Sequence, residues 1–284
     1  MLIGLHTSRA GSLENAALEA QAMGANTFQI FSASPRMWKA SAPHRDEIER
    51  FCLARERFRL VPLAIHCNYL VNLASIDPVV RERSIASFRG ELSRAAALRA
   101  EFLIVHPGNY KDQALEEGLK SFADGLAEAA RDLDPGGVAV LLENTVGCGH
   151  QLGSRFEELR AMGDMARVAT HLPVGYCLDT CHLLAAGFDI ATEAGLKTTL
   201  RQADKILGLK NVKVIHANDS KGGLGSRLDR HTNIGKGQIG EAGFARILTD
   251  PRLRDKPFIL ETPEGENHDR RADVAALQRL AILA

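Results

Sequence analysis

The chain has 284 residues, of which 45% are apolar and 25% are charged, and its 35 basic residues balance its 35 acidic ones. This length suits a single α/β barrel domain of about 250 residues, so we expect one domain over residues 1–284. The balanced charge lacks the basic excess that is common in nucleic-acid-binding proteins, although bound divalent ions would add positive charge at their site. No apolar run approaches the ~20 residues of a membrane-spanning helix.

The N-terminus and the cysteines predict the compartment. The first residues lack the basic region and the apolar stretch of a signal peptide. The five cysteines are odd in number and form no Cys-x-x-Cys pair, which is typical of reduced thiols in a cytoplasmic protein. We therefore expect a soluble cytoplasmic protein with no membrane contact. The sequence implies no obligate protein partner.

Short apolar runs alternate with helical patterns from one end of the chain to the other. Runs rich in Val, Ile, Leu and Phe are typical of strands that are buried on both faces of a parallel sheet. The predicted strands are 2–5, 27–31, 63–65, 102–105, 138–142, 174–178, 212–215 and 258–260. The predicted helices are 13–23, 44–58, 78–100, 114–133, 155–166, 192–207, 241–248 and 270–284. Strands that are each followed by a helix predict an α/β fold of the (β/α)8 TIM-barrel type.

One long segment carries no helical or strand pattern. It covers residues 219–240, is rich in glycine, and is predicted to be a structureless loop. Loops of this length are usually either functional or disordered. Because this loop contains further residues that can bind metals, we expect it to be functional.

Six predicted strands end on a residue that can bind a metal ion. These residues are His66, His106, Glu143, Asp179, His216 and Glu261. A lone His or Glu at a strand end is more often a packed, hydrogen-bonded residue than a ligand. Barrel strands, however, bring their carboxyl ends to one face, where the active sites of this fold lie. Six such residues in one layer therefore predict a metal site that binds more than one ion.

Three more candidates extend this set. His182 follows Asp179 by one helical turn, and Asp229 and His231 have the i, i+2 spacing that puts two side chains on the same side of an extended loop. Imidazole and carboxylate ligands with few thiolates suit Zn²⁺ in catalytic use. Nine ligands are too many for two ordinary catalytic zinc ions, so we expect three Zn²⁺ per chain, with Mn²⁺ or Fe²⁺ as possible substitutes.

At these residues the chain resembles the endonuclease IV family of apurinic/apyrimidinic endonucleases. The stretches that carry the resemblance are His106-Pro107-Gly108, Glu143-Asn144-Thr145, Asp179-Thr180-Cys181-His182, 216–221, 225–237 and Glu261-Thr262-Pro263. They occur in family order over almost the whole chain. The resemblance implies three zinc sites, and Glu143 would bridge the first two. Their ligands would be His66, His106 and Glu143 for the first, Glu143, Asp179, His216 and Glu261 for the second, and His182, Asp229 and His231 for the third.

The resemblance also implies the reaction and its substrate. The substrate would be double-stranded DNA that contains an abasic site, cleaved on the 5′ side of the lesion to leave a 3′-hydroxyl, and blocked 3′ ends would be trimmed as well. Zinc ions at such a site activate a water as the nucleophile. We assign Glu261 and Glu143 as catalytic residues, with Glu261 orienting the attacking hydroxide.

Lesion recognition needs side chains that can enter the base stack. Arg36 lies in the loop after the second strand, and Tyr69 and Leu70 follow His66 closely. The family resemblance implies that these three contact DNA. The glycine-rich loop is alone a weak phosphate signal, but it carries Arg227 and Arg230 toward the same site.

Some features depart from the family pattern or fit other functions. Cys67-Asn68 and the acidic segment 264–266 differ from the sequences usual in the family, but neither contains a ligand. The main alternative is a metal-dependent sugar isomerase or epimerase on the same barrel, which would have no use for a third ion at His182, Asp229 and His231. A non-catalytic metal- or DNA-binding module would not explain nine ligands around an open site.

Overall fold

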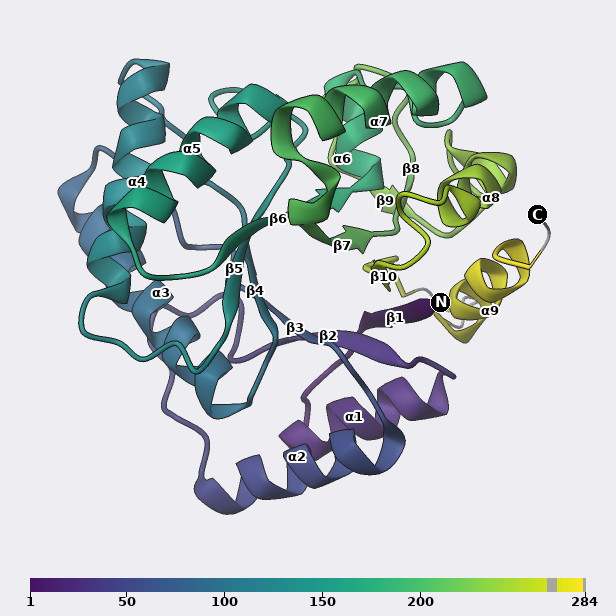
Figure 1. The fold of residues 1–284 in the computed structure, drawn as a ribbon. Coiled ribbons are helices and arrows are strands. Elements are labelled where there is room, and N and C mark those ends of the chain that lie inside the picture. The colour runs from purple at the N-terminus through teal and green to yellow at the C-terminus, as the bar shows by residue number, and fades with distance from the viewer. Residues whose placement is uncertain (265–269, 283–284) are drawn as a thin grey trace.

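The computed structural model describes residues 1–264 and 270–282, and these form a closed barrel of parallel strands surrounded by helices (Figure 1). The strand order around the barrel is β1-β10-β7-β6-β5-β4-β3-β2, so consecutive barrel strands are neighbours and the last pairs with the first. The (β/α)8 fold expected from the sequence is therefore confirmed. Among the described residues, no helix is both long enough and apolar enough to cross a membrane.

The barrel strands agree with the predicted ones to within a residue or two at each end. Their bounds are β1 (Leu2–His6), β2 (Thr27–Phe31), β3 (Leu63–His66), β4 (Phe102–Val105), β5 (Ala139–Glu143), β6 (Val174–Asp179), β7 (Val212–His216) and β10 (Pro257–Leu260). Most of their residues are buried, although Lys213 of β7 is exposed. Burial on both faces explains why the sequence shows apolar runs and not the regular alternation of a half-exposed strand.

The helices pack outside the barrel. Their bounds are α1 (Leu13–Ala22), α2 (Arg45–Phe58), α3 (Pro78–Ala97), α4 (Leu115–Ala130), α5 (Phe156–Ala169), α6 (Thr180–Ala186), α7 (Glu193–Leu207), α8 (Gly240–Thr249) and α9 (Arg270–Leu280), with a short 3-10 turn at Leu209–Asn211. Asp77 caps α3 as its position before Pro78 predicts, since its side chain accepts hydrogen bonds from the backbone N–H groups of Val79 and Val80.

Several predicted element ends were wrong. The third helix stops at Ala97 and not at residue 100, because Arg99 takes a left-handed backbone conformation with φ 52°. The fourth stops at Ala130, two residues before Asp132, whose φ is 58°. The last ends at Leu280, and residues 283–284 of its predicted span lie outside the described residues, as do residues 265 and 266 of the acidic segment.

The segment 219–240 is not structureless. Two parts of it pair as short antiparallel strands, β8 (Asp219–Ser220) and β9 (His231–Thr232). The fully buried carboxylate of Asp219 accepts hydrogen bonds at 3.0 Å from the backbone N–H groups of Gly235, Gly237 and Ile239. Because β8 and β9 are short, the loop is ordered mainly by this carboxylate, which satisfies backbone N–H groups of the loop.

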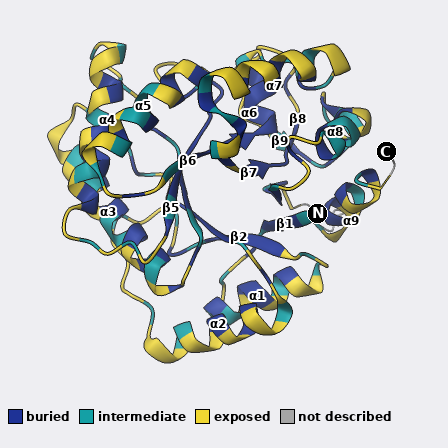
Figure 2. Cartoon of the chain, in the orientation of Figure 1, coloured by how far each residue is buried: buried dark blue, intermediate teal, exposed yellow. Residues whose placement is uncertain are grey.

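Two apolar layers hold the barrel together. The larger core lies between the strands and the surrounding helices, where buried residues line the inner helix faces (Figure 2). A smaller cluster fills the barrel interior and consists of Ala64, Ile104, Leu141, Cys177, Val214 and Ile259. Each of these residues precedes one of the six predicted strand-end ligands by two positions. Since side chains two apart in a strand point the same way, the six ligands lie directly above an apolar floor.

Candidate metal centre

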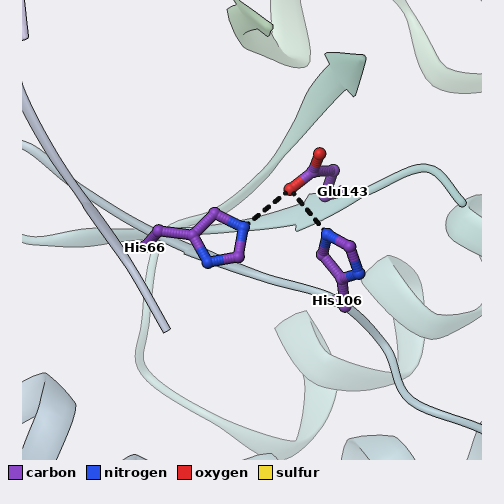
Figure 3. A group of neighbouring side chains, drawn as sticks. All are labelled: His66, His106 and Glu143. Atoms are coloured by element: carbon purple, nitrogen blue, oxygen red, sulfur yellow. Dashed lines mark hydrogen bonds and ion pairs between the residues drawn. The ribbon is translucent and has the colours of Figure 1, made fainter. Parts of the chain in front are cut away.

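The nine predicted ligands gather at the carboxyl end of the barrel in three groups. In the first group His66 and His106 both face Glu143 (Figure 3), with His66 Nε2 3.1 Å and His106 Nε2 3.2 Å from Glu143 Oε2. The ligand atoms of these three side chains all lie within 4.8 Å of one another. Three strands that are adjacent in the sheet, β3, β4 and β5, supply or immediately precede these residues.

The second group shares Glu143 with the first. His216 Nδ1 is 2.9 Å from Glu143 Oε1 and 3.4 Å from Glu261 Oε2, and Asp179 completes the set within the same 4.8 Å limit. The side chains of Glu143 and Asp179 are fully buried, whereas that of Glu261 is 18% exposed. Glu261 is therefore the carboxylate of this group that reaches the open side of the centre.

The third group joins the barrel to the glycine-rich loop. His182 Nε2 is 3.3 Å from Asp229 Oδ1, and His231 Nε2 is 3.6 Å from the same oxygen. Helix α6 places His182, while β9 places His231 beside it. The pairing of β8 with β9 thus brings the i, i+2 pair of Asp229 and His231 onto the centre.

Hydrogen bonds on the outer side fix the orientation of these imidazoles. His66 Nδ1 contacts the carbonyl oxygen of Cys67 at 2.7 Å, His182 Nδ1 that of Asn144 at 2.9 Å, and His231 Nδ1 that of Glu261 at 3.3 Å. An oxygen acceptor requires that this nitrogen carry a proton, so the other ring nitrogen, which faces the carboxylates of the centre, is the one that can bind a metal. This arrangement is usual for metal-binding histidines.

The charges of the centre depend on one another. Burial alone would raise the pKa of the Glu143 carboxyl, but the imidazoles of His216 and His106 lower it well below its usual range. Burial would lower the pKa of His182, yet neighbouring carboxylates, that of Asp179 first, raise it well above the usual imidazole value. Buried carboxylates are costly without cationic partners, and divalent cations can take this role in place of protonated imidazoles.

The surroundings of His231 Nε2 show whether these residues fit a metal ion. His231 Nε2 is buried and has no hydrogen-bond partner among the described residues. Asp179 Oδ2 and Asp229 Oδ1 are each 3.6 Å from it, too far for a hydrogen bond. Ligands that bind one zinc ion stand about 2 Å from it, so they are themselves separated by a gap of this kind. The donor set and the unpartnered nitrogen therefore fit a cation.

An open cavity of about 380 Å³ gives access to the centre. Its lining combines predicted ligands with residues that the sequence did not single out as functional. The lining consists of His6, Phe31, His66, Tyr69, His106, His182, Asp229, His231, Glu261, Thr262 and Arg270. Two further residues form hydrogen bonds with the ligand side chains. Gln29 contacts His216 and Glu261, and Asn218 donates to Asp179 Oδ2 at 2.6 Å.

Comparison with known proteins identifies the family. Residues 17–280 match the family model of the xylose isomerase-like TIM barrel. The chain is 59% identical over 281 residues to the probable endonuclease 4 of Solibacter usitatus, covering 99% of this chain and 97% of that protein. It is 42% identical over 268 residues to an endonuclease 4 of Thermus thermophilus, covering 94% of this chain and 93% of that protein. The chain belongs to the endonuclease IV family.

Solved structures agree with this assignment to the endonuclease IV family. A crystal structure of endonuclease IV from Thermus thermophilus superposes with a TM-score of 0.84 at 40% identity, covering 98% of this chain and all of that one. A D-tagatose 3-epimerase-like protein superposes with a TM-score of 0.69 at 19% identity, covering 99% of this chain and 95% of that one. The epimerase-like protein shares the fold, whereas the endonuclease IV proteins share the sequence as well.

The residues predicted to bind DNA occupy different parts of the rim of this endonuclease IV barrel. Tyr69 lines the cavity and is 66% exposed. Arg36 is exposed nearby, and the backbone N–H of Tyr69 donates to the carbonyl oxygen of Pro35 at 3.2 Å, which ties the two loops together. Leu70 is half-buried beside them.

The two arginines of the glycine-rich loop lie farther out. Both are exposed, and neither lines the cavity among the described residues. Arg227 donates to the carbonyl oxygen of Gly147 at 2.6 Å and lines a neighbouring hollow, and Arg230 donates to the carbonyl oxygen of Asp229 at 2.8 Å. Contact of these two residues with DNA stays a prediction.

A buried polar cluster supports the loops that carry Arg36 and Tyr69. We call it the rim anchor, and it consists of Ser32, Asn68, Glu91 and Arg94. Arg94 Nη2 and Nε lie 3.1 Å from Glu91 and 2.7 Å from Ser32, and Ser32 donates to Glu91. Asn68 donates to Glu91 at 3.4 Å and accepts from the backbone N–H of Leu70 at 3.0 Å. The departure from the family pattern at this asparagine therefore serves to hold the loop in place.

Proposed function

We propose that this member of the endonuclease IV family is a DNA repair enzyme that hydrolyses the phosphodiester bond 5′ to an abasic site in double-stranded DNA. The product would carry a 3′-hydroxyl, and blocked 3′ ends would be trimmed by the same centre. The observation that carries the proposal is the presence of three ligand groups around one open cavity in a chain of this family.

The ligand groups fit three divalent ions. The first would be held by His66, His106 and Glu143 and the second by Glu143, Asp179, His216 and Glu261, while the third would be held by His182, Asp229 and His231. Imidazole and carboxylate donors suit Zn²⁺ and also accept Mn²⁺ or Fe²⁺. When bound, such ions lower the pKa of a coordinated water and offset the charge of the scissile phosphate.

Glu143, Glu261 and Tyr69 have different roles in the proposed reaction. Glu143 is fully buried and contacts imidazoles of the first and the second group, so its role is to join these two groups. Glu261 lines the cavity, and its partly exposed carboxylate can accept a hydrogen bond from an attacking water and orient it. Tyr69 lies at the opening, where a nucleotide that has left the base stack would enter.

A single assay tests this function. A duplex with one abasic site should be cleaved 5′ to the lesion, and a chelator should abolish the cleavage until zinc is restored. An intact duplex of the same sequence is the control and should remain uncut. If the abasic duplex is not cut by the zinc-loaded protein, the proposed function is wrong.

Ion counting tests the three groups separately. Protein purified without chelator should contain close to three divalent ions, and His231→Ala should contain close to two, because His231 belongs to the third ligand group and to neither of the other two. Elemental analysis of both proteins is the measurement. His171→Ala, which removes an exposed imidazole that contacts the Leu133 carbonyl oxygen, is the matched control and should keep all three. Loss of every ion from His231→Ala would mean that the groups do not bind independently.

The rim residues should affect recognition and not the metal centre. Arg36→Ala, Tyr69→Ala and Leu70→Ala should each weaken binding to abasic duplex by roughly 1–3 kcal/mol, the range for loss of a stacked or inserted side chain. On a blocked 3′ end at a nick, which requires no flipping, the loss of kcat/KM should be smaller.

The control for this experiment is Ile76→Ala, which truncates an apolar residue that is 58% exposed in the segment that follows Leu70. It should leave kcat/KM for both substrates unchanged, and the ion content of all four variants should equal that of the unmodified protein. Equal losses on the two substrates would show that the rim residues do not act as a wedge.

A further inference from the structure

Gln29 is a polar side chain in the middle of an apolar strand. It lies in β2 within the run Thr27–Phe31 and is fully buried. Its backbone pairs with that of Ala64, whose side chain belongs to the apolar floor, and on the other side with that of His6. A buried amide at this level requires hydrogen-bond partners, because an unsatisfied one costs about 1–3 kcal/mol.

The side-chain partners of Gln29 lie at the metal centre. Gln29 Nε2 donates to Glu261 Oε1 at 2.6 Å and lies 3.0 Å from His6 Nδ1. Gln29 Oε1 lies 2.9 Å from His216 Nε2. One amide therefore contacts two of the four side chains of the second ligand group, through Glu261 Oε1 and His216 Nε2, whereas Glu261 Oε2 and His216 Nδ1 face the rest of that group.

The chemistry of these contacts fixes two orientations. The amide nitrogen must face Glu261, because the amide oxygen would repel the carboxylate. The amide oxygen then faces His216 and can only accept, so His216 carries its proton on Nε2. His216 Nδ1, the atom 2.9 Å from Glu143, is then the ring nitrogen that can give up its proton to bind a metal. The hydrogen bond from Gln29 to Glu261 Oε1 likewise turns the other oxygen, Oε2, toward His216 Nδ1 and the rest of the metal centre.

We propose that Gln29 is a positioning residue for the second ion group, where it fixes the tautomer of His216 and the rotation of the Glu261 carboxylate. The expected effect of Gln29 on catalysis rests on the proposed function. Its expected effect on ion binding does not, because ion binding can be measured without DNA. Gln29 is fully buried and is not part of the cavity lining, so it does not contact DNA itself.

Two variants test this role. Gln29→Met keeps the length of the side chain and removes the hydrogen bonds to Glu261, His216 and His6. Gln29→Asn withdraws the amide by one methylene and serves if the first variant does not fold. Changes of this kind usually cost 10–100-fold in metal affinity, so about one ion per chain should become roughly 10–100-fold easier to remove by a competing chelator. The other two ions should be retained as in the unmodified protein.

A second readout separates positioning from general damage. With zinc in excess, kcat on abasic duplex should fall at least about 10-fold while KM stays unchanged, because the rim is untouched. Gln113→Met is the matched control, since it removes a glutamine amide that donates to the Ala74 carbonyl oxygen at 2.6 Å away from the centre. It should retain all ions and full kcat.

The outcomes can be told apart. Folded Gln29 variants that hold every ion as tightly as the unmodified protein and keep its kcat would overturn the positioning role. Equal weakening of all three ions would also overturn it, because that result indicates general destabilisation. If the unmodified protein binds its ions but cuts no abasic duplex, the proposed function fails, while the difference in ion retention still decides the role of Gln29.

Discussion

Glu261→Gln is expected to reduce strand cleavage at an abasic site by at least ~10³-fold, the scale of removing a key electrostatic group from an active site. The substitution keeps the shape of the side chain but removes the charge that faces the cavity and His216. It also places an amide beside the amide of Gln29, where a carboxylate now accepts a hydrogen bond. Binding to abasic duplex should change little, because Glu261 belongs to the centre and not to the rim.

The measurement is single-turnover cleavage together with binding of the same duplex. Glu241→Gln is the matched control, because it neutralises a half-exposed carboxylate that pairs with Arg279 on the outside of the barrel. Its cleavage rate should equal that of the unmodified protein. Turnover of Glu261→Gln near the unmodified rate would remove Glu261 from the mechanism.

Glu143→Gln should produce the second large loss, for a different reason. Its carboxylate contacts His66 and His106 through one oxygen and His216 through the other, so it is common to two ion groups. Replacement by an amide removes the one charge that both groups share. We expect the ion content to fall from close to three toward one, and cleavage to fall by at least ~10³-fold.

Elemental analysis and the cleavage assay together check this expectation. Glu101→Gln provides the comparison, because it neutralises a carboxylate next to β4 that pairs with Arg55 at 2.9 Å, away from the centre. That variant should keep its ions and its activity. Retention of all three ions by Glu143→Gln would show that the carboxylate charge is not what joins the two groups.

The strand-end ligands could be predicted from sequence because the barrel converts a local pattern into a spatial one. A residue such as His66 or Glu143 ends an apolar strand, and the fold brings the ends of all parallel strands to one face. The same reasoning predicts that His216 and Glu261 lie together at this face. The pairing of Asp229 with His231 required only a short spacing in an extended segment.

Other parts of the site left no local signal. The hydrogen bond between Gln29 and Glu261 joins residues 232 positions apart, and a single glutamine in a strand says nothing about which ligand it contacts. Strands β8 and β9 have two residues each, too few for any periodicity. The guanidinium of Arg227 contacts the carbonyl oxygen of Gly147, 80 positions away, and the spacing of basic residues in its loop does not reveal this.

The rim anchor has a consequence for how substrate preference can change in evolution or by design. Glu91 and Arg94 belong to α3, where they are buried, and this helix contains none of the nine metal ligands. A substitution at either position would shift the loops that carry Arg36 and Tyr69. It would change none of the predicted DNA-binding residues and none of the nine metal ligands. Libraries that vary Ser32, Asn68, Glu91 and Arg94 together would therefore sample new lesion preferences on an unchanged hydrolytic centre.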